Sequence, residues 1–273
     1  MTDPEISSAT QPNQSAVYRR YLQLQSIRVA RLPRDTADGL AGLLLTCVGF
    51  DLEGAELALA TTISGGTFLG IDPFSDHLKT AVRNGACDFM VNTLDESLRV
   101  LKNELRKKKA LSVGLLGEAS AILSAMVERG VQPDLMADCG ASSSGSTSPY
   151  QTALMEFIER GAVSVDTHAT TVSIGGFVEV VWTAASLADL RRMDELALGL
   201  VPSDDSIRRR WLQHAPGYFH RQRPLQRVLG MRPEEVTQLA EEFKNAILGG
   251  EIQSTVTLVR QTEDGSKETV ALQ

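Results

Sequence analysis

The stretch LSVGLLGEASAILSAMVERGVQPDLMADCG (111–140) decides the fold. It starts with an apolar run ending in glycine, continues with apolar residues at helical spacing, and passes through a Pro-Asp turn into a second apolar run. A strand, a helix and a strand in this order are typical of a right-handed crossover between parallel strands. We therefore expect a parallel sheet, and ask whether this unit binds a nucleotide or serves only as scaffold.

The same alternation of strand and helix patterns continues on both sides of this stretch. The run LLLTCVGF (43–50) is apolar throughout, as expected of a strand buried on both faces. The other expected elements are strands at 66–72, 89–92 and 162–166, and helices at 54–64, 73–84 and 95–109. The sequence thus predicts an α/β fold with a Rossmann-like, doubly wound parallel sheet.

The rest of the chain is expected to add a helical region and closing βα elements to that fold. Helical patterns run over 186–220 and 233–248, followed by a strand at 254–260 and a tail that either forms an edge hairpin or stays loose. The predicted layout is a disordered tail at 1–16, a Rossmann-like domain at 17–185, further elements of the same fold unit at 186–264, and a tail at 265–273.

Composition limits the classes of partner. The chain has 273 residues and a net charge of −7, so no overall positive field draws nucleic acid or an anionic membrane. No window approaches the roughly 20 apolar residues of a membrane span, and the first 16 residues lack the pattern of a signal peptide. Three widely spaced cysteines do not form a closed disulfide framework. We expect a cytoplasmic protein with small-molecule or protein partners.

In a doubly wound sheet, ligands bind at the carboxyl ends of the strands near the topological switch point. The loop after the first strand has only Gly49 and Gly54, with Asp51 and Glu53 between them, which makes a poor phosphate cradle. Asp72 ends the second strand and is interpreted equally as a ligand for ribose hydroxyls or as a turn residue before a proline.

Other polar residues have both a functional and a structural interpretation. Cys139 and His168 each follow a strand end and are weak catalytic candidates, the alternatives being a buried thiol and a solvated imidazole. Cys47 and Cys87 are interpreted as core, and the histidines show no metal-binding spacing. A cluster of arginines is interpreted as a solvated helix face, the alternatives being a clamp for an anion or a contact with acidic groups of a second subunit. It consists of Arg208, Arg209, Arg210, Arg221, Arg223 and Arg227.

Several long segments, in order, resemble one known family. They are GGTFLGIDPFSDHLKTAVRNGACDFMVNTLDESLRV, LSVGLLGEASAILSAMVERGVQPDLMAD, MEFIERGAVSVD, GFVEVVW and EEFKNAILGGEIQSTVTLVRQTEDG. Together, over roughly 40–264, they resemble the NAD-binding half of urocanase (urocanate hydratase) and the stretch that follows it.

The resemblance implies a Rossmann-like domain that holds NAD as an electrophile, which bonds to the imidazole of urocanate so that water can add. This is a lyase step of histidine degradation, carried out by homodimers, and we expect a homodimer that uses part of 186–229. The NAD-binding residues implied by the resemblance are Gly49, Gly54 and Ala55 in the first loop, Asp72 after the second strand, Gly117, Glu118 and Ala119 in a turn, and Asp138 at the start of a polar loop.

The sequence also departs from the family pattern. Glu118 stands where the family has Asn, and 139–144 reads Cys-Gly-Ala-Ser-Ser-Ser in place of Gln-Thr-Ser-Ala-His-Asp. Residues 227–230 read Arg-Val-Leu-Gly in place of the family segment Ile-Cys-Trp-Leu-Gly, and the family's long N-terminal and glycine- and histidine-rich C-terminal regions have no counterpart. The changes at Glu118 and 139–144, together with the few glycines of the first loop, predict weak or lost NAD binding. The change at 227–230 and the missing flanking regions predict that the chain is not a complete urocanate hydratase.

Three functions follow as expectations. The leading one is a stand-alone urocanase-like Rossmann protein that binds NAD(H) weakly and is not a complete urocanate hydratase. The second is a non-catalytic scaffold or subunit that docks to itself or to a partner enzyme. The third is a hydratase or lyase that acts on an unknown substrate with a loosely held nucleotide.

Overall fold

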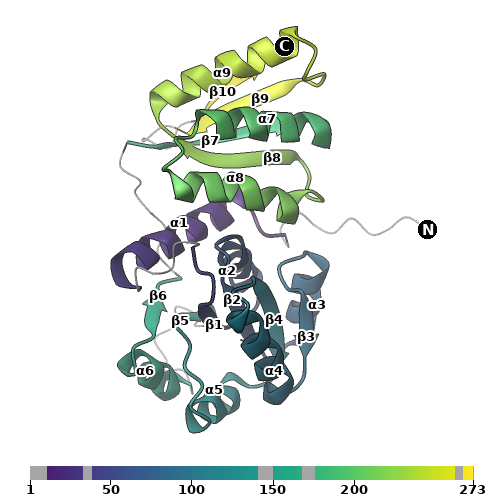
Figure 1. The fold of residues 1–273 in the computed structure, drawn as a ribbon. Helices are drawn as coiled ribbons and strands as arrows, with labels where there is room; N and C mark the ends of the chain where they lie inside the picture. Colours follow the sequence, from purple (N-terminus) through teal and green to yellow (C-terminus); the bar gives the residue numbers. More distant parts are fainter. Residues whose placement is uncertain (1–10, 33–38, 141–149, 168–175, 262–266, 273) are drawn as a thin grey trace, which may run out of the picture. The chain divides into compact units, whose positions relative to one another are not determined.

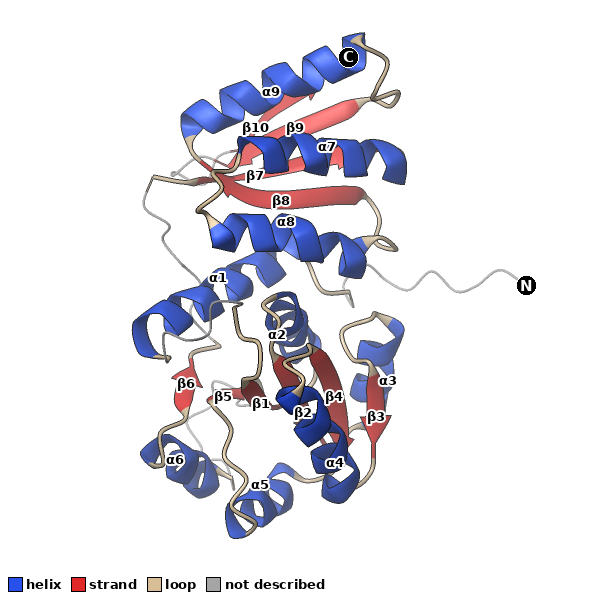
Figure 2. Cartoon of the chain, viewed as in Figure 1, coloured by secondary structure: helices blue, strands red, loops and turns tan. Residues whose placement is uncertain are grey.

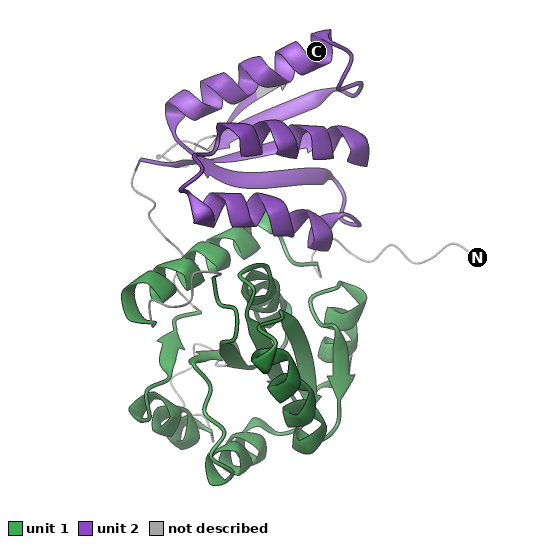
Figure 3. Cartoon of the chain, viewed as in Figure 1, with its two compact units in different colours: residues 1–171 green, residues 172–273 purple. Residues whose placement is uncertain are grey.

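The computed structural model describes residues 11–32, 39–140, 150–167, 176–261 and 267–272. The chain divides into two compact units, unit 1 over Met1–Thr171 and unit 2 over Val172–Gln273 (Figures 1 and 3). Each unit has its own sheet and its own core. None of the helices in these described ranges combines the length and the apolar composition that a membrane span requires.

Unit 1 is built on a six-stranded sheet with the order β3-β4-β2-β1-β5-β6. Every pairing in it is parallel, including β1 with β2 and β1 with β5, so the predicted parallel sheet is confirmed. Its strands are β1 (Leu44–Val48), β2 (Thr67–Asp72), β3 (Phe89–Val91), β4 (Leu111–Leu116), β5 (Leu135–Asp138) and β6 (Val163–Val165). Its helices are α1 (Gln14–Arg31), α2 (Leu52–Ile63), α3 (Ser75–Arg83), α4 (Leu94–Arg106), α5 (Ala119–Glu128) and α6 (Gln151–Glu159).

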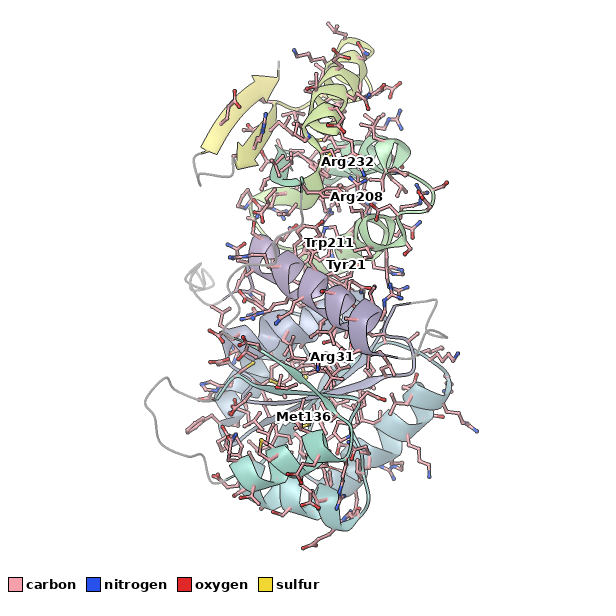
Figure 4. All side chains as sticks on the ribbon, turned by 90° about the vertical axis from the view of Figure 1, so that its left-hand side faces the viewer. Tyr21, Arg31, Met136, Arg208, Trp211 and Arg232 are labelled. Atoms are coloured by element: carbon pink, nitrogen blue, oxygen red, sulfur yellow. The ribbon has the colours of Figure 1, made fainter. Side chains whose placement is uncertain are left out.

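Helices cover both faces of this sheet, as its sequence predicts. Every residue of β1 and β2 is buried, which explains why these strands are apolar without alternation. On one face the core joins strand residues such as Met136 (Figure 4) to Leu101 of α4, Leu123 of α5 and Phe157 of α6. On the other face α2 and α3 contact the sheet, and α1 packs on α2.

Unit 2 has a four-stranded antiparallel sheet with the order β10-β9-β7-β8. Its strands are β7 (Val178–Ala184), β8 (Leu225–Met231), β9 (Val256–Gln261) and β10 (Lys267–Leu272), and its helices are α7 (Leu187–Leu200), α8 (Ser206–Phe219) and α9 (Pro233–Leu248). The three helices lie on one face of the sheet (Figure 2). The alternating burial along β7 agrees with a sheet covered on one side.

This layout differs from the predicted one in three places. Strand β7 belongs to the second sheet, so 17–185 is not one domain and 186–264 does not continue its fold unit. Helix α1 begins at Gln14, inside the segment predicted as a tail. Strand β10 pairs with β9, so the hairpin interpretation of the C-terminal segment holds and 265–273 is not simply a tail.

Candidate functional site

The candidate site is the edge of the unit 1 sheet where its parallel strands end. Strand β1 lies between β2 and β5, and the chain runs to β2 on one side and reaches β5 on the other only after β4 (Figure 1). This change of direction makes the gap between the β1 and β5 ends the topological switch point, where such folds bind ligands.

The loop from β1 to α2 keeps two of the three glycines of a dinucleotide fingerprint. Residues 49–54 read Gly-Phe-Asp-Leu-Glu-Gly, which has the spacing G-x-G-x-x-G with Asp51 at the second glycine. Gly49 has a φ of +87°, as the tight turn requires, and a Cβ on Gly54 would lie 2.4 Å from the Gly49 carbonyl oxygen. The first and third glycines therefore keep their structural roles, while the second, which lets a pyrophosphate approach, is replaced.

The Asp51 side chain accepts hydrogen bonds from the backbone N–H groups at the start of α2. It is the N-cap residue, and its Oδ1 accepts from the backbone N–H of Glu53 at 3.1 Å and of Gly54 at 3.2 Å. These are among the N–H groups that a helix N-terminus offers to an anion. Ala55, one residue further, is buried, and its N–H donates to the Asp51 carbonyl.

Phe50 fills the space between this loop and β2. Its side chain is 1% exposed, and a Cβ on Gly70 would lie 2.3 Å from its ring. The ring also contacts Phe68 edge to face, with centroids 5.3 Å apart. Gly70 is thus needed so that Phe50 can pack against the strand.

Asp72 is a structural acceptor at the end of β2. It is 2% exposed, its Oδ2 accepts from the Phe50 N–H at 2.7 Å, and its Oδ1 accepts from the Phe74 N–H at 2.7 Å. The Nδ1 of His77 lies 3.0 Å from Oδ2. These contacts fit the turn interpretation from sequence, while the ribose interpretation stays a prediction, because each carboxylate oxygen can accept more than one hydrogen bond.

The turn after β4 lies next to Asp72. The Gly117 N–H donates to the Asp72 carbonyl at 3.0 Å, which ties the ends of β4 and β2 together. Glu118 is exposed at the N-cap position of α5 and makes no side-chain capping bond, and Ala119 is buried. Glu118 therefore adds a negative charge to this edge, with no ion-pair partner among the residues that the structure describes.

The end of β5 approaches the β1 loop closely. Asp138 accepts from the Tyr150 hydroxyl at 3.0 Å and from the Gly140 N–H at 3.1 Å, while the Thr167 hydroxyl donates to its carbonyl at 2.8 Å. A Cβ on Gly49 would lie 2.8 Å from the Gly140 nitrogen. The two loops that flank the switch point are therefore in backbone contact.

Two thiols meet at the same place, which sequence reasoning missed. The Sγ atoms of Cys47 on β1 and Cys139 after β5 are 3.2 Å apart, and both cysteines are free. Cys47 is fully buried and Cys87, elsewhere in unit 1, is buried as well, so both core interpretations are confirmed, whereas Cys139 is partly exposed. Burial and the neighbouring Cys139 raise the pKa of Cys47 well above its usual value.

The remaining titratable candidates do not join this edge into an acid–base or metal site. His168 lies outside the described residues, and among the described ones no group of three metal-ligating side chains converges. Burial, together with the charge of Arg210, lowers the pKa of His214. Of the two catalytic candidates predicted from sequence, only Cys139 lies among the described residues, and its neighbour is the thiol of Cys47.

Two arginines interpreted as solvated or intersubunit are instead buried within unit 2. Arg227 on β8 is 2% exposed and binds Asp194 of α7, with its Nη2 2.9 Å from Oδ2. The Trp182 indole N–H donates to the same carboxylate at 3.1 Å. The solvated interpretation is wrong for this residue, because its guanidinium is buried in the core of unit 2 and is paired with an internal carboxylate.

The second buried arginine starts α8. Arg208 is 4% exposed and forms two bonds to Glu235 of α9, at 2.5 and 3.0 Å. Burial alone raises the pKa of Glu235, but the bonds and charge of Arg208 outweigh it and hold that pKa below its usual value. Arg208 and Arg232, both labelled in Figure 4, have their guanidinium carbons 4.9 and 5.6 Å from the centroid of the Phe177 ring. Both buried arginines fix the core of unit 2.

Among solved structures, PKMT2 from Rickettsia typhi in complex with AdoHcy is similar to this chain at 14% sequence identity and a TM-score of 0.26. The match covers 78% of this chain and 33% of that one, so the chain spans about a third of that protein's length. A likeness at this level carries no argument about fold or function.

Two family models match consecutive parts of the chain. The model of the urocanase Rossmann-like domain matches residues 26–175, and the model of the urocanase C-terminal domain matches residues 172–270. The junction of the two matches falls where the structure divides unit 1 from unit 2. The chain therefore belongs to the urocanase family.

Proposed function

We propose that this urocanase-family protein binds NAD only weakly and does not hydrate urocanate by itself. The observation that carries the proposal is the pair of bonds from the Glu53 and Gly54 N–H groups to the Asp51 carboxylate. In a dinucleotide-binding fold, N–H groups at this helix terminus face the pyrophosphate. A carboxylate in that position occupies the donors and repels the phosphate charge.

Two neighbouring residues support the same proposal. The ring of Phe50 is buried against β2, and the carboxylate of Asp72 is held by the N–H groups of Phe50 and Phe74. An acid at the end of the second strand would otherwise bind ribose hydroxyls. The residues present do not fit a tightly held dinucleotide.

Strand β8 supports the second half of the proposal. Its residues 227–230 stand where the resemblance places the family segment Ile-Cys-Trp-Leu-Gly, and they contain no cysteine. Val228 and Leu229 are fully buried, and Arg227 is bound to Asp194. This segment therefore packs in the core of unit 2, with its one charged side chain held by Asp194.

The substitution Asp51→Gly tests the proposal, because it restores the full G-x-G-x-x-G spacing. We expect the variant to bind NAD at least about tenfold more tightly than the wild type in calorimetric titrations. Two unit charges 4 Å apart interact by about 4 kcal/mol at an effective dielectric constant of 20, and about 1.4 kcal/mol is a factor of ten. The fold should tolerate the change, because glycine at an N-cap costs only a few tenths of a kcal/mol relative to aspartate.

Glu53→Gln is the matched control. It removes a charge from the same helical turn but leaves the capping bonds of Asp51 in place, and the Glu53 side chain is about half exposed near Arg20. We expect a smaller gain than for Asp51→Gly. A third variant, Glu118→Asn, removes the charge at the start of α5. Equal NAD affinity of Asp51→Gly and the wild type would show that Asp51 is not what weakens NAD binding.

A further inference from the structure

The pair of thiols at the switch point is not explained by weak nucleotide binding or by core packing alone. Cys47 and Cys139 are 92 positions apart in the chain, yet their Sγ atoms are separated by 3.2 Å. A disulfide bond needs about 2.05 Å, so the sulfurs have to approach by roughly 1.2 Å. No other cysteine joins this pair, because Cys87 donates to the Phe89 carbonyl instead.

The sheet explains why these two side chains meet. Cys47 pairs with Ala137 in the parallel β1·β5 register, so Cys139, two residues further, projects to the same face as Cys47. The chain bends towards β1 there, because the N–H groups of Cys139 and Gly140 both donate to the Val48 carbonyl, at 2.8 and 3.1 Å. The strand register and these two backbone hydrogen bonds thus bring the two cysteines side by side.

We propose that Cys47 and Cys139 are a redox-active pair that forms a reversible disulfide when the protein meets a peroxide. This proposal is independent of the proposed function. It assigns a modification site to the gap between the β1 and β5 ends, and it gives the two cysteines different roles.

Exposure decides the roles. Cys139 is partly exposed beside the exposed Gly140, whereas Cys47 is fully buried. The thiolate of Cys139 attacks a peroxide oxygen, the O–O bond breaks, and a sulfenic acid forms while the leaving hydroxide takes a proton to become water. Cys47 then attacks the Cys139 sulfur, its proton goes to the leaving hydroxyl, and a second water departs as the S–S bond forms.

The step balances as two thiols and one hydrogen peroxide giving one disulfide and two waters. Burial raises the pKa of Cys47, which slows its ionisation. The fixed proximity of the sulfurs offsets this, because a second step within one molecule has a large effective concentration. A dithiol reductant reverses the reaction by thiol–disulfide exchange.

The test uses the full chain and hydrogen peroxide under native conditions. Trypsin places the three cysteines on separate peptides, 35–79, 84–99 and 130–160. After oxidation, denaturation and alkylation, we expect three free thiols to fall to one, peptide 35–79 to be linked to 130–160, and peptide 84–99 to be alkylated. Dithiothreitol should restore all three thiols.

Variants separate this result from unspecific oxidation. Cys87→Ser should keep the link, because burial raises the pKa of the Cys87 thiol to about 12 and its side chain stays out of the reaction. Cys47→Ser and Cys139→Ser should each abolish it, and in Cys47→Ser the sulfenic acid of Cys139 should proceed to sulfinic acid. Peroxide that oxidises wild-type Cys139 without linking it to Cys47, or links involving Cys87 in the folded protein, would overturn the proposal.

Discussion

Replacing Arg227 by methionine is expected to lower the free energy of unfolding of unit 2 by about 3–5 kcal/mol, because it leaves a buried carboxylate without its cation. Asp194 would then keep only the Trp182 indole N–H as a bonded partner among those described here. Both tryptophans of the chain, Trp182 and Trp211, lie in unit 2. Urea unfolding followed by tryptophan fluorescence therefore reports on this unit.

Two further variants make the Arg227 result specific. Arg192→Met removes an exposed arginine of α7 that pairs with Glu195 and Glu251, and ion pairs at the surface contribute little to stability. The double variant Asp194→Leu with Arg227→Met removes both charges and should recover most of the lost stability. A loss in Arg227→Met no larger than in Arg192→Met would contradict the assignment of a buried ion pair.

Replacing Asp72 by alanine is expected to destabilise unit 1 by about 3–6 kcal/mol, because it removes two hydrogen bonds to a charged group, which contribute about 1.5–3 kcal/mol each. The change leaves the N–H groups of Phe50 and Phe74 without their acceptor. Phe50 would lose the hydrogen bond that holds it over Gly70, so the amides of the β1–α2 loop should exchange hydrogen faster as well. Urea unfolding by far-ultraviolet circular dichroism and hydrogen exchange of the loop peptides measure the two effects.

Asp76→Ala is the control on the neighbouring helix. Asp76 is exposed in the first turn of α3 and pairs only with Lys79 among the described side chains, so its loss should change stability by less than about 1 kcal/mol. Asp72→Asn should lose more stability than Asp76→Ala and less than Asp72→Ala, because the amide oxygen of asparagine can still accept one of the two hydrogen bonds. If Asp72→Ala behaves like Asp76→Ala, Asp72 is not the structural acceptor that its contacts indicate.

The sheet of unit 1 was predictable because its strands are continuous apolar runs separated by helical patterns. Strand β8 was not among the predicted elements, because Arg227 interrupts its apolar pattern, and only the partner Asp194 makes that charge tolerable. The sequence pattern also does not reveal the boundary between units 1 and 2, at 171–172. The alternation of helix and strand continues past it, although the sheet changes from parallel to antiparallel.

The candidate site is only partly predictable from sequence. The replacement at Asp51 is visible in the G-x-D-x-x-G spacing of residues 49–54, but its capping bonds emerge only with the helix. The packing of Phe50 over Gly70 and the meeting of Cys47 with Cys139 depend on which strands are neighbours and in what register. Local patterns do not contain that information, because the residues that meet lie 20 to 92 positions apart in the chain.

The nucleotide content of the wild-type protein, purified without added cofactor, tests the central claim most directly. The protein is denatured, and the released small molecules are quantified by mass spectrometry against the protein concentration. With Asp51 on the helix N-terminus and Asp72 bound to its own loop, the account predicts far less than one NAD per chain. One NAD retained per chain through purification would contradict it and would mean that the site holds the cofactor despite these contacts.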